Sequence, residues 1–344
     1  MNAAGFAAAI ATAALLASVP GALRAQGATG GGSAPTPAAA PTPEPWLTRP
    51  ALVPPDYRLA PRQIAPRTWV VEGAVADFER RNGCNIINTG FIATGAGVVV
   101  INTGVSRRYG EQLRAAIAQV TAEPIVRVIN LNLHPDYFLG NQAFTDRPLQ
   151  AEAATIAGQR REGGAYVDNL FRLCGDWMRD TESVPAREPI GPGRLRVGSH
   201  ELELVSLSGH TDADLVVLDR GTGVMFAGGL AFLDRVPTTP HARLAAWIDS
   251  LDRLNAIEGV SVLVPSHGPV DAGRRAITQT RDWLTWLDET FKTAAARGLE
   301  MNEVLRLPVP QRFAHFAALK AEYARSVHHL YPSYERAVLM PVTK

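Results

Sequence analysis

The chain has 344 residues, of which 46% are apolar and 19% are charged, as expected for a globular protein with a buried core. The formal net charge is +1, and the charged residues are scattered without a basic run. Nucleic-acid binding depends on neutralising phosphates with clustered Lys and Arg, so we expect no nucleic-acid partner.

The N-terminal segment has the pattern of a secretion signal. Residues 6–19 form an apolar, Ala-rich run that is too short to span a bilayer comfortably. Small residues up to Ala25 suit a signal peptidase, which predicts a signal peptide over residues 1–25. We therefore expect a periplasmic protein with no membrane span after cleavage. The segment before the apolar run lacks Lys and Arg, so an uncleaved anchor or a disordered tail stays the alternative.

The chain then divides into a linker, a domain and a helical extension. Residues 26–60 are rich in Gly, Ala and Pro and predict a flexible tether, because they offer few apolar side chains to bury. Residues 61–272 predict one folded domain. Residues 273–344 predict helices that pack on that domain, since apolar side chains recur there at helical spacing.

Strands and helices alternate within the domain. In its first half, strands are predicted at 69–73, 86–92, 97–101 and 125–129, with a helix at 106–120. In its second half, strands are predicted at 194–198, 201–205, 215–218, 224–226 and 260–264, with a helix at 242–255. Two half-domains of this kind, each a sheet covered by helices, predict an α/β protein with a four-layer αββα sandwich.

Three histidines each follow a predicted strand, in turns flanked by Gly or Pro: His134, His210 and His267. Asp136 lies two residues after His134. Ligands on neighbouring strand ends can converge at one edge of a sheet, and zinc accepts imidazole nitrogen and carboxylate oxygen. These four residues are the predicted metal ligands.

The order of these motifs resembles the metallo-β-lactamase superfamily, whose signature is H-x-H-x-D-H after a strand, then G-H-T, A-G-D and a final S-H-G or G-H-G. Further segments resemble the exported group called quinoprotein relay system zinc metallohydrolases, and they are residues 88–92, 101–104, 140–144 and 211–215. The resemblance covers about residue 64 to the C-terminus. It implies a metallo-β-lactamase-type αββα sandwich and a dinuclear zinc hydrolase of an ester, lactone, thioester or amide.

Several ligand positions of that family carry other residues in this chain. The resemblance places Asn132 at the first His position, Tyr137 at the last His of the signature, and Gly229 at the bridging Asp. Asn102 is a fourth change near the same edge, where related chains often have Asp. An Asn amide and a Tyr phenol are weaker zinc donors than imidazole, and Gly supplies no donor.

The replacements leave two readings of function open. The first is a hydrolase with an eroded site that holds one zinc ion, in which Asp136 is also a candidate catalytic residue. The second is an inactive relative that holds no metal and binds a small molecule or a partner protein. By resemblance, that partner would belong to a periplasmic quinoprotein dehydrogenase relay system, and the small molecule is unknown.

The remaining polar residues carry simpler expectations. Asp212 or Asp214 is expected to orient His210 as a hydrogen-bond acceptor, or to form a turn. Cys84 and Cys174 either pair in a disulfide or stay separate buried thiols. The other histidines are predicted to be surface or packing residues: His200, His241, His315, His328 and His329.

Overall fold

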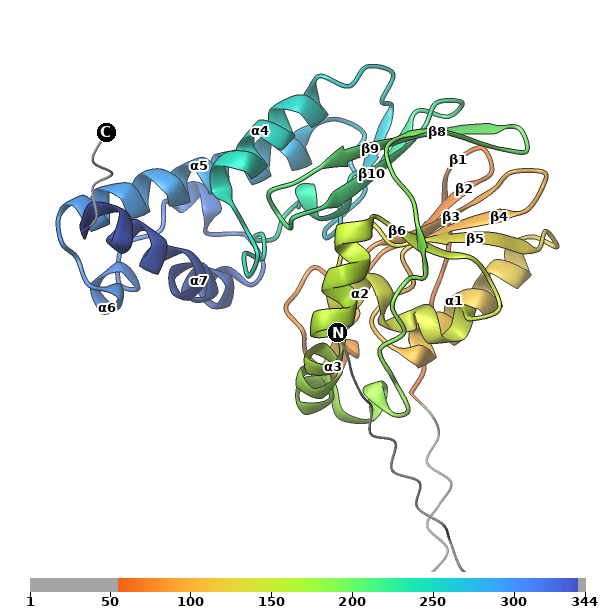
Figure 1. Ribbon diagram of the computed structural model, residues 1–344, viewed down its shortest axis with the longest axis horizontal. Helices are drawn as coiled ribbons and strands as arrows, with labels where there is room; N and C mark the ends of the chain where they lie inside the picture. Colours follow the sequence, from red (N-terminus) through yellow and green to blue (C-terminus); the bar gives the residue numbers. More distant parts are fainter. Residues whose placement is uncertain (1–54, 340–344) are drawn as a thin grey trace, which may run out of the picture. The chain divides into compact units, whose positions relative to one another are not determined.

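The computed structural model describes residues 55–339, all of which belong to the compact unit Pro54–Lys344 (Figure 1). The predicted signal peptide and most of the predicted linker lie outside the described residues. None of the helices between residues 55 and 339 is long and apolar enough to cross a membrane.

The first sheet has seven strands, and its order follows the chain from β1 to β7. Neighbours from β1 to β4 run antiparallel, whereas β4 to β7 run parallel, so a crossover follows each of β4, β5 and β6. The strands are β1 (Arg62–Ala65), β2 (Thr68–Val71), β3 (Thr89–Ala93), β4 (Val98–Ile101), β5 (Ile125–Ile129), β6 (Leu149–Ala151) and β7 (Glu188–Pro189).

Two long helices cover the outer face of this sheet. They are α1 (Arg107–Val120) and α3 (Ala153–Cys174), and their apolar residues share one core with β3, β4 and β5. Ser106 begins α1 as its N-cap, because its Oγ accepts a hydrogen bond from the Tyr109 N–H at 3.1 Å. The helix therefore starts where the apolar periodicity predicts it.

The second sheet has five strands in the order β12-β11-β10-β9-β8. Only β11 and β12 are parallel. Its outer face packs against α4 (Leu244–Asn255) and α5 (Arg275–Ala296) in a second core. The strands are β8 (Gly193–Val197), β9 (His200–Leu207), β10 (Asp214–Asp219), β11 (Val224–Phe226) and β12 (Val262–Val264).

A third apolar core lies between the sheets. It joins Ile92, Val99 and Ile129 from the first sheet to Leu204 and Val217 from the second. The alternation of inward and outward residues along each strand gives every sheet one face for this core and one for its helices. The predicted two-sheet αββα fold with a helical C-terminal region is therefore confirmed.

The C-terminal region contains α5, then α6 (Met301–Val304) and α7 (Leu319–Leu339). Helix α7 packs on α5, with Val327 and Tyr331 buried against it. Shorter helical pieces are α2 (Pro135–Phe138) and the 3-10 turns Arg80–Asn82, Leu139–Phe144, Gly175–Met178, Gly228–Leu230 and Gln311–Phe313.

Two predicted element starts are corrected by tertiary hydrogen bonds. The strand predicted from Ile86 begins only at Thr89, because the Asn88 N–H donates to the carbonyl of Ser266 at 2.8 Å instead of to a neighbouring strand. The helix predicted from Ala242 begins at Leu244, because Arg243 has an extended backbone with φ of −119° and ψ of 97°, and its N–H donates to the carbonyl of Gly209. Neither partner is visible in the local sequence.

Cys84 and Cys174 form a disulfide in the structure, with their Cα atoms 6.1 Å apart. The bridge joins the loop after β2 to the C-terminal end of α3. The bridge joins residues 90 positions apart in the sequence and lies in the apolar core that the first sheet shares with α1 and α3.

Candidate functional site

The predicted site residues lie just beyond the C-terminal ends of strands in both sheets. Asn132, His134 and Asp136 follow β5, His210 follows β9, and His267 follows β12. All five side chains are buried, with at most 6% of each residue exposed. The fold therefore gathers residues from separate parts of the chain at one edge of the sandwich.

Buried amides hold the loop after β5 in place. The Asn130 side chain donates to the carbonyl of Tyr137 at 3.2 Å, and the Asn141 side chain donates to the Asn130 Oδ1 at 2.8 Å. Thr103 in turn donates to the Asn141 Oδ1 at 2.9 Å. Because all these groups are buried, their mutual hydrogen bonds stabilise one loop conformation.

Two other asparagines anchor the neighbouring loops. The Asn88 Nδ2 donates to the carbonyls of Pro265 and Gly268, which flank His267. Asn102 has a left-handed backbone with φ of 59°, a conformation that Asn tolerates better than most residues, and its Oδ1 accepts from the Leu131 N–H at 3.0 Å. Asn102 thus supports the loop backbone.

His134 is hydrogen bonded to a second histidine. Its Nε2 lies 2.9 Å from the Nδ1 of His241, whose Nε2 lies 2.8 Å from the Glu162 carboxylate on α3. The Tyr166 hydroxyl donates to the same carboxylate at 2.6 Å. Burial, followed by the neighbouring histidines, lowers the pKa of His134 well below its ordinary value. His241, predicted to be a surface or packing residue, thus contacts a predicted site residue.

His210 is oriented by Asp214. The Asp214 Oδ1 lies 3.1 Å from the His210 Nδ1, and the same carboxylate accepts from the Thr211 N–H at 2.8 Å. Asp212 instead forms an exposed ion pair with Arg243. Among residues 55–339, the buried His210 Nε2 has no hydrogen-bond partner, and the ring lies 4.5 Å from that of His134 between centroids.

Asp136 and His267 form the third pair. The His267 Nε2 lies 3.0 Å from the Asp136 Oδ2, and its Nδ1 lies 2.9 Å from the Ser266 hydroxyl. Burial lowers the pKa of His267 to about 4, although the Asp136 carboxylate acts in the opposite direction. The ring also stacks on Phe232, with 4.9 Å between centroids.

The replaced positions complete the packing around these pairs. The Tyr137 hydroxyl is buried and has no hydrogen-bond partner in the described part of the chain, and burial together with the Asp136 charge raises its pKa well above its ordinary value. A Cβ atom at Gly229 would lie 1.9 Å from the His210 Nδ1 and 2.6 Å from the Asn132 Nδ2. The place of a side chain at position 229 is thus filled by His210.

These side chains do not fit a two-zinc centre. Within residues 55–339, no three His, Cys, Asp or Glu side chains are arranged so that they could hold a metal ion. Each predicted ligand instead has at least one hydrogen-bonding partner within the protein, and a phenol that keeps its proton is a poor ligand. The assignment of His134, Asp136, His210 and His267 as ligands, and of Asp136 as catalytic, stays a prediction.

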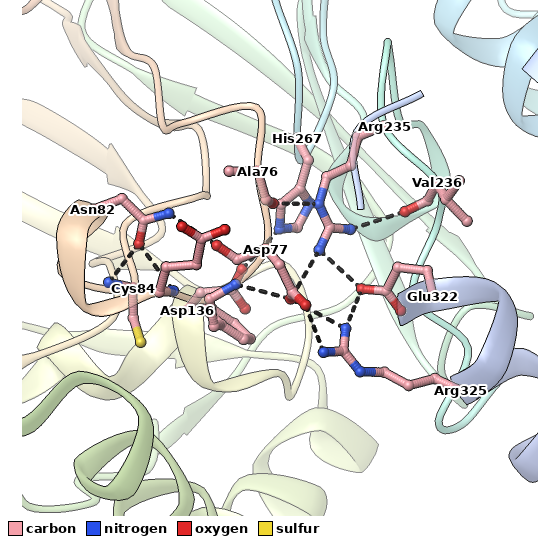
Figure 2. A network of polar contacts seen from close by, with 12 residues as sticks. Ala76, Asp77, Asn82, Cys84, Asp136, Arg235, Val236, His267, Glu322 and Arg325 are labelled. Atoms are coloured by element: carbon pink, nitrogen blue, oxygen red, sulfur yellow. Dashed lines mark hydrogen bonds and ion pairs between the residues drawn. The ribbon is translucent and has the colours of Figure 1, made fainter. Parts of the chain in front are cut away.

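A pocket of about 250 Å³ opens beside the site. His134, Asp136 and His267 form one side of it, while α3 contributes apolar side chains and α7 contributes Glu322 and Arg325. Figure 2 shows Asp136 and His267 close to Arg235, Glu322 and Arg325. A larger hollow of about 670 Å³ lined by α4, α5 and α7 contains none of the predicted site residues.

Comparisons with known proteins agree with this architecture. The curated protein named linear primary-alkylsulfatase, from a Pseudomonas species, is 18% identical over 278 residues, covering 68% of this chain. The chain spans about half the length of that relative, 52%. Among solved structures, a metallo-β-lactamase from Pontibacter korlensis aligns with a TM-score of 0.55 at 19% identity, covering 66% of this chain and 99% of its own.

A metallo-β-lactamase from Hirschia baltica aligns with a TM-score of 0.52 at 17% identity, covering 66% of this chain and 97% of its own. At these identities the structural matches show the fold alone. The family model described as metallo-β-lactamase superfamily matches residues 82–267, which is more than half of the chain and includes every predicted ligand position. The chain therefore belongs to the metallo-β-lactamase superfamily.

Proposed function

We propose that this protein is a superfamily member that lacks the two-zinc hydrolytic centre and uses the pocket beside it to bind a small organic molecule. The observation that carries the proposal is the pairing of the predicted ligands within the protein. His134 contacts His241, His210 contacts Asp214, and Asp136 contacts His267. The contacts of His134, Asp136 and His267 each occupy a nitrogen or oxygen atom that could otherwise bind a zinc ion, whereas the contact of His210 leaves its Nε2 free among the described residues.

The packing at position 229 supports the same proposal. A bridging carboxylate holds two ions together, and Gly229 provides neither the carboxylate nor the space for one while His210 keeps its position. The buried, protonated Tyr137 offers no charge to balance a second ion. The pocket of about 250 Å³ is large enough for a small organic ligand.

The metal part of the proposal is tested by metal analysis of the full chain after incubation with zinc chloride and removal of free metal. We expect less than one zinc ion per chain. Retention of two ions per chain would refute the proposal. His315→Ala serves as the control for the histidine variants named below, since His315 is exposed and outside the site.

The binding part is tested with a small-molecule fragment set observed by NMR. Asn169 is exposed on α3 and lines the pocket, so Asn169→Trp should block the pocket mouth and abolish the binding of most fragments. Asp168→Trp is the matched control, because Asp168 is the exposed neighbour that lines a different hollow. If fragments bind equally well to both variants, the pocket is not the binding site.

A second candidate is a hydrolase with one zinc ion. Its support is that the His134 and His210 rings lie 4.5 Å apart at 89° and that Asp214 contacts the far nitrogen of His210, as carboxylates commonly do for metal-bound histidines. One zinc ion would supply Lewis-acid chemistry for hydrolysis of an ester, lactone, thioester or amide. One ion per chain that is lost in His134→Ala and in His210→Ala would favour this candidate.

The proposal also includes export of the protein to the periplasm and a partner protein there. The apolar run at 6–19 and the small residues up to Ala25 support export to the periplasm, and the motif resemblance supports a partner in a quinoprotein dehydrogenase relay system. Mass spectrometry of the protein recovered from a periplasmic fraction should give a chain that begins after Ala25. A chain that keeps residues 1–25 would refute this cleavage.

A further inference from the structure

The pocket beside the site has two apolar walls that come from separate parts of the chain. The loop between β2 and β3 contributes Phe78 and Ile86, and the C-terminal half of α3 contributes Leu170 and Leu173. Ile86 and Leu170 are almost fully buried, at 0% and 1% exposure. The placement of this loop against α3 therefore shapes the apolar side of the pocket.

The disulfide connects these two walls directly. Cys84 lies two residues before Ile86, and Cys174 follows Leu173. The Cα atoms of the two cysteines are 6.1 Å apart, and both side chains are fully buried. A disulfide keeps its two Cα atoms within about 7 Å of each other, so the walls cannot move apart while the bond is present.

Tight packing also fixes the loop around Cys84. Gly83 has φ of 62°, and a Cβ atom there would lie 2.6 Å from the Trp177 ring and 2.8 Å from the Tyr57 ring. The Cys84 N–H donates to the Asn82 Oδ1 at 2.9 Å (Figure 2). Close packing and hydrogen bonds thus hold the loop in one position next to the disulfide.

Ion pairs hold the same loop to α7. Arg325 donates to Asp77 at 3.1 and 2.6 Å and to Glu322 at 2.8 Å. Arg235, which is fully buried, donates to the same Glu322 oxygen at 2.9 Å and to the carbonyl of Ala76 at 2.8 Å (Figure 2). Two guanidinium groups face two carboxylates, so these charges are paired with one another. The apolar walls are therefore the main source of binding energy in this part of the pocket.

We propose that the pocket binds an aliphatic molecule of limited length, and that the Cys84–Cys174 disulfide sets this limit by holding the two apolar walls together. This inference rests on the proposed binding function and names the class of its ligand. Each added methylene gains apolar contact until the walls are reached. Walls that are fixed in advance favour binding, because the ligand does not have to order them, and they exclude longer bodies. A polar end group stays at the mouth beside the exposed Asn169.

The probes are the straight-chain primary alcohols from butanol to decanol, which share one hydroxyl group and differ only in the length of the aliphatic body. NMR titration of the full chain should give a Kd that falls about fourfold for each added methylene and then levels off within the series. A Kd that is the same for all the alcohols would overturn the ligand class, and so would an absence of binding. A Kd that keeps falling up to decanol would overturn the length limit.

The double variant Cys84→Ser with Cys174→Ser tests the role of the disulfide. At a temperature at which this variant is folded, its Kd should keep falling beyond the length at which the unchanged protein levels off. Short alcohols should bind more weakly to it, because its walls are no longer held in place. Leu251→Ala on α4 truncates a buried side chain that does not line the pocket, and is the control for lower stability. This control should keep the profile of the unchanged protein. A double variant that levels off at the same length contradicts the role of the disulfide.

Leu173→Trp tests the length limit with the disulfide intact. Leu173 is 44% exposed and lines the pocket, so the variant should fold and level off at a shorter alcohol. We expect its Kd for the longest alcohol that fits the unchanged protein to rise at least about fourfold. Phe171→Trp is the matched control, because it adds the same ring to the same helix at a 52% exposed position that lines another hollow. Identical profiles for the two variants would contradict the proposal.

The outcomes separate the two proposals about this pocket. If the double cysteine variant does not fold, the pair Leu173→Trp and Phe171→Trp decides the length limit. Fragments that bind in a manner sensitive to Asn169→Trp, together with alcohols that do not bind, overturn the ligand class alone. Fragment binding that is indifferent to Asn169→Trp overturns the binding function itself.

Discussion

The Nε2 of His134 lies 2.9 Å from the Nδ1 of His241, a residue 107 positions later in the chain. The contact joins the loop after β5 to the loop before α4, and Glu162 on α3 extends it to a third element. A predicted metal ligand is thus held by a histidine–carboxylate pair in the protein itself.

Removal of His241 should destabilise the site. His241→Leu leaves the buried His134 Nε2 without this partner, and we expect the free energy of unfolding to fall by about 1–2 kcal/mol. Urea unfolding measured by circular dichroism tests this. His328→Leu, at an exposed position on α7, should change stability far less. Equal effects of both changes would show that the contact contributes nothing.

Adding a side chain at position 229 should destabilise the protein. Gly229→Ala places a Cβ atom 1.9 Å from the present position of the His210 Nδ1, so the ring must move, and we expect a loss of about 1–3 kcal/mol in stability. Gly164→Ala on α3 is the matched control, because a Cβ there meets no atom of the described residues within 4 Å. That change should stabilise the helix by roughly 0.5–1 kcal/mol. Thermal unfolding of the two variants compares them, and a neutral Gly229→Ala would contradict the packing around His210.

The disulfide should contribute strongly to stability. It closes a sequence separation of 90 residues, for which the chain-entropy model gives about 4 kcal/mol. The paired variant Cys84→Ser with Cys174→Ser should lose about that amount in urea unfolding. The unchanged protein treated with a reductant should behave like the variant. If the reductant does not lower the stability of the unchanged protein while the double variant is less stable, the loss in the variant comes from poorer packing at the two replaced cysteines and not from loss of the disulfide.

The ion cluster around Asp77 should give stability that depends on pH. Burial by itself would raise the pKa of Asp77, but the hydrogen bonds and charge of Arg325 outweigh it and lower the pKa below 3.8. A carboxyl group with a lowered native pKa stabilises the fold above its unfolded pKa and loses that contribution as pH falls through the native pKa. We therefore expect Asp77 to contribute to the loss of stability as pH falls below about 4.

Asp77→Asn should cost about 2 kcal/mol at pH 7 and flatten the part of the acid transition that Asp77 contributes. Unfolding midpoints measured from neutral to acidic pH test this. Asp212→Asn removes a carboxylate from an exposed ion pair and should leave the curve nearly unchanged. An acid transition that is identical in all three proteins would exclude Asp77 from it.

Much of the architecture could be predicted because it depends on local pattern. The strand Ile125–Ile129 and the strand Val224–Phe226 coincide with their apolar runs, and α1 begins after its Ser106 cap. Helix α3 was missed, since its Gly163-Gly164 pair and its many polar residues weaken the periodic signal. The apolar residues of α3 can be identified as core residues only from their packing against the first sheet.

The candidate site shows the same division between what the local sequence predicts and what tertiary packing decides. The sequence by itself determined which side chains follow the strand ends, and that Asn132, Tyr137 and Gly229 stand where the superfamily has ligands. Tertiary structure alone decided the partners of those side chains, including His241, and the wall that α7 adds to the pocket. Strand ends follow from local periodicity, whereas a hydrogen bond across 107 residues follows from how separate elements pack, for which the local sequence carries no signal.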